Sequence, residues 1–102
     1  MIKKLVAADF RGANLRGVKA AFANMTGANF GGADLTGGKF PKAKLRVASF
    51  DKAQLEGVDF RGADLRQASI RDANLKYANL EGANIRGADM TGSDTYFMKG
   101  GK

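Results

Sequence analysis

The chain has 102 residues, a formal net charge of +7 and a 44% apolar fraction, so we expect one domain with a buried core. It contains no cysteine, histidine or tryptophan. This composition excludes disulfides and thiolate chemistry, and it removes the commonest catalytic bases and transition-metal ligands. A small basic domain favours anionic partners, such as nucleic acid, an acidic protein surface or anionic lipid.

The N-terminal segment MIKKLVAADF carries two lysines but has neither the apolar stretch nor the cleavage signature of a signal peptide. No apolar run in the sequence approaches the roughly 18 residues that cross a bilayer. We therefore expect a cytoplasmic protein with no membrane span.

A period of five residues then runs along the chain. Every fifth residue from Leu5 to Met90 is apolar, and the residue two positions earlier is mostly alanine. Asn or Asp often precedes the large residue, and Gly often follows two positions after it. A chain that turns a corner once in five residues keeps both apolar classes inside, and Gly, Asn and Asp suit such corners. Because one such unit cannot bury its face alone, the units must stack into a solenoid.

The segments ANLRG, ADLTG, ADLRQ and ANLKY resemble the A(D/N)LXX motif of the pentapeptide repeat family. The resemblance extends from residue 3 to about residue 95. It implies an all-β fold, a right-handed quadrilateral parallel β-helix with 20 residues in each coil and about five coils. We expect this β-helix to span residues 1–95, and residues 96–102 to form a C-terminal cap or dimer contact.

A 20-residue coil stacks the large residues into four ladders that fill a narrow core. One ladder begins with Phe10, Phe30 and Phe50, whereas another contains only leucine before Thr95. Ala20 leaves one core position under-filled in the first coil. We expect the outward-facing Phe22 to pack into that gap, with a contact surface as the alternative.

Basic residues gather on two adjoining sides of the predicted rod. Arg46, Arg66 and Arg86 occupy equivalent positions in successive coils, and Asp64 is the one carboxylate on their side. Arginine suits both phosphate and carboxylate, so these sides are either a site for an anionic partner or simply a solvated surface. The candidate site comprises Lys44, Arg46, Arg66, Arg86, Lys19, Lys39, Lys42 and Arg61.

The C-terminal segment TYFMKGGK departs from the repeat. Phe97 lies one predicted coil beyond Tyr77, so the two rings are expected to pack together. Several family members dimerise through C-terminal hydrophobic residues. Tyr77, Tyr96, Phe97 and Met98 are therefore candidates for either an end cap or a homodimer contact.

Nothing in the sequence predicts catalysis. The glycines follow the five-residue period and are explained as corners, so they do not indicate a nucleotide-binding loop. We expect a non-enzymatic interaction or scaffold module without cofactor or metal, which presents its basic stripe to an acidic protein surface or nucleic acid. One alternative is a DNA gyrase modulator like the quinolone-resistance pentapeptide proteins, which resemble DNA in shape and negative charge; the +7 charge disfavours it. Another is a purely structural or designed repeat without a specific partner.

Overall fold

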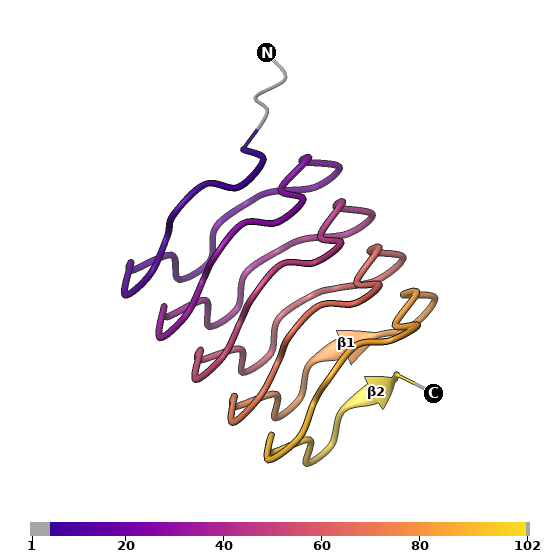
Figure 1. Ribbon diagram of the computed structural model, residues 1–102. Helices are drawn as coiled ribbons and strands as arrows, with labels where there is room; N and C mark the ends of the chain where they lie inside the picture. The colour runs from indigo at the N-terminus through magenta and orange to yellow at the C-terminus, as the bar shows by residue number, and fades with distance from the viewer. Residues whose placement is uncertain (1–4, 102) are drawn as a thin grey trace.

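The computed structural model describes residues 5–101, which wind into a stack of coils (Figure 1). A turn recurs every five residues, so each coil has four sides. Parallel bridges join residues that are 20 apart, from the pair Asp9 and Asn29 to the pair Asn74 and Asp94. The strands β1 (Asn79–Leu80) and β2 (Lys99–Gly100) continue the same parallel register. These pairings confirm the 20-residue coil.

Each corner is a tight turn that starts at a large inward residue. In the first described corner, the Ala8 N–H donates a hydrogen bond to the Leu5 carbonyl oxygen at 3.1 Å. The third residue of the turn has a positive φ, as at Ala7 and Gly12, which is typical of a type II turn. Glycine adopts this conformation without steric cost, which explains its recurrence at five-residue spacing.

The Asn or Asp before each large residue closes the following corner with its side chain. Asp34 Oδ1, for example, accepts hydrogen bonds from the backbone N–H of Thr36 at 3.1 Å and from its hydroxyl at 2.6 Å. This Asx-type bond satisfies a backbone donor that the coil-to-coil ladder leaves unpaired. The polar position of the repeat therefore has a structural role at most corners.

The core is a column of side chains inside the coils. Phe30 lies between Phe10 and Phe50 with stacked rings, and the ring centroids are 5.1 Å and 4.7 Å apart. Phe60 meets Phe50 edge to face at 5.4 Å. Leu35, like the leucines that follow it in its ladder, is fully buried. The interior of the middle coils is therefore filled by the chain's own side chains.

The first described coil is packed less completely. A hollow of about 450 Å³ lies beside Ala20, with Phe40 at its wall. The expectation that Phe22 packs into this gap is wrong, because the Phe22 side chain lies at the rim and is 69% exposed. Its position at the corner of the coil, with a φ of 61°, directs the ring outward instead of into the core.

The last coil extends past residue 95, where the domain boundary was expected. Lys99 pairs with Asn79 and Gly100 pairs with Leu80, so residues 96–100 complete the coil (Figure 1). Among residues 5–101, no helix has the length and apolar character required to cross a membrane.

Candidate anion-binding face

Three arginines occupy the same outward position in successive coils. Arg46, Arg66 and Arg86, together with Gln67 and Gly87, line one surface hollow of about 240 Å³. Neighbouring coils of a parallel β structure are about 4.8 Å apart, so three guanidinium groups are held within a short column. The structure thus brings together the three arginines that the repeat register had aligned.

Arg66, in the middle of this column, already has a carboxylate partner. Its Nε donates to Asp64 Oδ1 at 2.8 Å, and its Nη2 donates to Asp64 Oδ2 at 2.6 Å. These bonds lower the pKa of Asp64, and the charge of Arg46 contributes a smaller effect in the same direction. Neither Arg46 nor Arg86 forms a salt bridge within residues 5–101. The column therefore presents two unpaired guanidinium groups on either side of a neutralised pair.

Lys44, another predicted site residue, lies in register with Asp64 of the next coil and is exposed. No salt bridge joins these two residues in the described part of the chain. The four predicted residues of this side therefore lie on one face, but only one of them is held by an ion pair.

The adjoining side divides into a neutralised half and a basic half. Arg61 donates to both carboxylate oxygens of the buried Asp59, at 3.0 Å and 2.8 Å, and lowers its pKa. In the coils before this pair, Lys19 and Lys39 face each other across a parallel bridge. Lys42 is also exposed on this side. Sequence reasoning grouped these four residues, and the structure keeps Arg61 next to Lys42, whose backbone N–H donates to the Arg61 carbonyl oxygen at 2.8 Å. Arg61 differs from the three lysines because its side chain is paired with a carboxylate.

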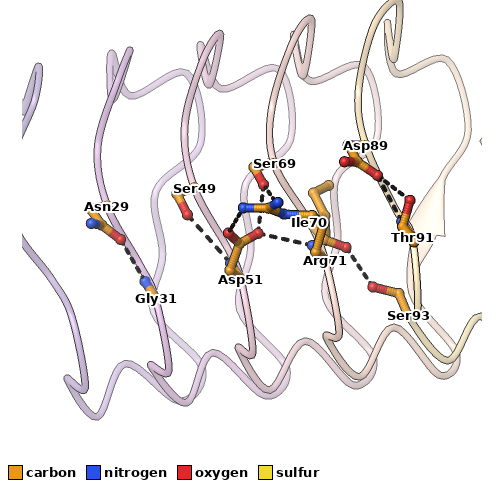
Figure 2. Close-up of polar contacts among 10 residues, drawn as sticks. All are labelled: Asn29, Gly31, Ser49, Asp51, Ser69, Ile70, Arg71, Asp89, Thr91 and Ser93. Carbon is orange, nitrogen blue, oxygen red and sulfur yellow. Dashed lines mark hydrogen bonds and ion pairs between the residues drawn. The ribbon is translucent and has the colours of Figure 1, made fainter.

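On the side that contains Phe10, Phe30 and Phe50, Asp51 is bonded from the neighbouring coil, whereas Asp89 is bonded to Thr91 in its own corner (Figure 2). Asp51 accepts hydrogen bonds from the Ser69 hydroxyl at 2.6 Å and from the Arg71 backbone at 3.0 Å. Arg71 Nη2 also pairs with Asp51 Oδ2 at 2.9 Å. This network neutralises the side locally and ties adjacent coils together.

Ser93 has a structural role that sequence reasoning missed. Its hydroxyl donates to the Ile70 carbonyl oxygen (Figure 2). It also accepts a hydrogen bond from the Ala73 backbone N–H at 3.0 Å. The hydroxyl thus bridges the two ends of a corner that elsewhere closes directly. The available signal was a polar residue at a position that the repeat otherwise fills with alanine.

An exposed aromatic cluster lies in the last two coils. The rings of Tyr77 and Phe97 are stacked at 5.1 Å, as the register predicted, and Tyr96 contacts Phe97 at 4.2 Å. All three side chains are exposed: Tyr77 by 58%, Phe97 by 59% and Tyr96 by 65%. Met98 packs against the core. The homodimer contact expected here stays a prediction.

Comparison with known families decides the class of the chain. The model of the pentapeptide repeats matches residues 4–32, 28–67 and 53–92, with eight copies. The chain belongs to the pentapeptide repeat family. This result confirms the resemblance that the ANLRG-type segments indicated.

Solved pentapeptide repeat structures show the same fold. HetL, which is involved in heterocyst differentiation regulation in Nostoc sp. strain PCC 7120, is 29% identical with a TM-score of 0.90; the match covers 94% of this chain and 46% of HetL. A pentapeptide repeat protein of the Arabidopsis thaliana thylakoid lumen is 31% identical with a TM-score of 0.71, covering 90% and 61% of the two chains. Another pentapeptide repeat protein from Nostoc PCC 7120 is 26% identical with a TM-score of 0.65, and the match covers 89% of this chain and 83% of that protein.

These neighbours confirm the right-handed quadrilateral β-helix. The chain spans about half the length of HetL and about three-fifths of the Arabidopsis protein. A comparison with curated proteins finds no match. Within residues 5–101, no group of three acidic, histidine or cysteine side chains is arranged to hold a metal ion.

Proposed function

We propose that this pentapeptide repeat protein is a non-catalytic binding module whose arginine column binds an anionic partner, either nucleic acid or an acidic protein surface. The observation that carries the proposal is the hollow shared by Arg46, Arg66 and Arg86. Arginine presents a planar fork of donors that matches phosphate and carboxylate oxygens. A rigid coil spacing holds these forks in a fixed arrangement, which reduces the entropy lost on binding.

The charge pattern around the column supports the same function. Arg46 and Arg86 lack carboxylate partners among residues 5–101, whereas Asp64 satisfies Arg66. An unpaired guanidinium group on a stiff surface is available for an incoming anion. The filled interior of the middle coils leaves their outer surface as the place for a partner, and the chain has no histidine or cysteine for common catalytic roles.

The experiment compares two variants of equal net charge. In the face variant, Arg46, Arg66 and Arg86 are replaced by glutamine. In the control variant, glutamine replaces three basic residues of the other two sides, which are Arg16, Lys52 and Lys76. Each substitution set lowers the charge by three, so a difference between the variants reports position and not total charge.

Binding of labelled duplex DNA and of polyglutamate is measured at low salt by fluorescence anisotropy. We expect the face variant to bind at least one of these polymers about tenfold more weakly than the control variant, because charge-assisted hydrogen bonds typically contribute more than 1 kcal/mol each. Equal affinities of the two variants, or no binding of either polymer to the unmodified protein, would contradict the proposal.

A further inference from the structure

A second feature lies on the adjoining side, where Phe22 is the most exposed large apolar side chain among residues 5–101, at 69%. The ring projects from a corner with a φ of 61°, outside the core ladders. Lys42 Nζ lies 5.8 Å from the ring centroid, a cation–π distance. The later corners on this edge hold Gly62 and Gly82, so the fold does not require an aromatic ring here.

Three lysines lie on this side of the first coils, and Lys42 is the one whose Nζ is next to the ring. Lys19 and Lys39 are directly opposite in adjacent coils, an arrangement of like charges that disfavours folding. No salt bridge to Lys19, Lys39 or Lys42 occurs within residues 5–101. Asp59 on this side is paired with Arg61, and it also lies in parallel register with Lys39, whose charge helps to lower the Asp59 pKa. The lysines are therefore only partly offset by Asp59, and this side keeps an excess of positive charge next to an exposed ring.

The apolar hollow of about 450 Å³ opens beside the same ring. Its wall is formed mainly by inward side chains of the first described coil, with Phe22 beside them, and among residues 5–101 Lys19 is the charged residue that lines it. An apolar surface with a cationic rim complements a ligand that joins a flat apolar group to an anion.

We propose that Phe22, Lys19, Lys39 and Lys42 bind single-stranded nucleic acid. A base of the strand stacks on the Phe22 ring, and the three lysines contact the neighbouring phosphates. Single-strand binding proteins combine cationic surfaces with exposed aromatic rings in this way, because every base offers a π-face. An acidic peptide supplies carboxylates but not a regular series of flat groups, so it uses the lysines without the ring.

This inference rests on the proposed function, and it specifies single-stranded nucleic acid as the anionic partner of the side that carries Phe22. It is tested with the substitution Phe22→Gly, which places at this corner the residue found at Gly62 and Gly82 and therefore preserves the fold. The matched control is Phe97→Gly, which removes another exposed ring, 59% against 69% for Phe22, from a corner with a φ of 57° in the last coil. Thermal unfolding of both variants establishes that they are folded.

Binding of a labelled oligothymidylate of about 15 nucleotides is measured by anisotropy, and polyphosphate binding is measured separately. We expect Phe22→Gly to weaken oligothymidylate binding roughly 5- to 150-fold, which corresponds to the loss of one stacked base. Phe97→Gly and Phe22→Tyr are expected to bind as the unmodified protein does. Polyphosphate, which has no base, is expected to bind Phe22→Gly with unchanged affinity.

Two results overturn the inference, and they are distinguishable. If Phe22→Gly binds oligothymidylate as tightly as the unmodified protein, and polyphosphate binds to both proteins, the stacking site is wrong. The proposed function of the arginine column is then untouched, because the face variant tests it separately. If the unmodified protein binds neither oligothymidylate nor polyphosphate at low salt, both the stacking site and anion binding by this side are wrong.

Discussion

Phe50 in the middle of the core offers a sharp test of the stacked-coil account. Its side chain is fully buried, stacks on Phe30 at 4.7 Å and meets Phe60 edge to face at 5.4 Å. Truncation of a buried phenylalanine to alanine costs about 3–5 kcal/mol, and two lost ring pairs place Phe50→Ala near the upper end. For a chain of this size the melting temperature should fall by about 15 °C or more.

Phe10→Ala provides the matched control for this measurement. Phe10 belongs to the same ladder but is only partly buried, and its single ring contact is with Phe30 at 5.1 Å. We expect about half the destabilisation of Phe50→Ala, measured by urea unfolding followed by circular dichroism. An equal loss of stability in the two variants, or an unchanged melting temperature in Phe50→Ala, would refute the continuous core.

Two further predictions concern a buried carboxylate and a corner. The pKa of Asp59 is lowered by its hydrogen bonds from Arg61, so the ionised group stabilises the fold above the unfolded pKa of about 3.9, and this contribution is lost as the pH falls below that value. In urea unfolding, the unmodified protein should therefore exceed Asp59→Asn in free energy of unfolding by more at neutral pH than at about pH 3. An equal difference at the two pH values would contradict this prediction. Val47 is β-branched and has a φ of 59°, so Val47→Gly should raise the free energy of unfolding by up to about 1 kcal/mol, whereas a loss of stability would show that no strain is relieved.

The architecture was predictable because the five-residue period assigns the same environment to residues far apart in the sequence. Leu35 and Leu55 reach equivalent core positions without any long-range information beyond the 20-residue coil, which the family resemblance supplied. The contact between Tyr77 and Phe97 followed from the same arithmetic. A periodic sequence thus specifies packing wherever the repeat is regular.

The parts that the sequence did not predict depend on side-chain choices between neighbouring coils. The register placed Arg66 on the basic side, but only the coordinates reveal its two hydrogen bonds to Asp64. Asp51 pairs with Arg71 of the next coil instead of a residue in its own corner. Phe22 turns outward because the corner geometry decides the direction of its side chain. In each case a side chain can reach several polar or apolar partners at similar distances, and the repeat pattern does not show which of these partners it contacts.

The salt dependence of duplex DNA binding tests the central claim most directly. Counterion release makes the logarithm of the affinity fall with the logarithm of the salt concentration, with a slope of about −0.9 for each phosphate neutralised. If all three arginines of the column contact phosphates, the slope of the face variant should be shallower than that of the unmodified protein by up to about 2.7. Identical slopes for the two proteins would show that the arginine column does not engage the phosphates of DNA, which would contradict its binding of nucleic acid.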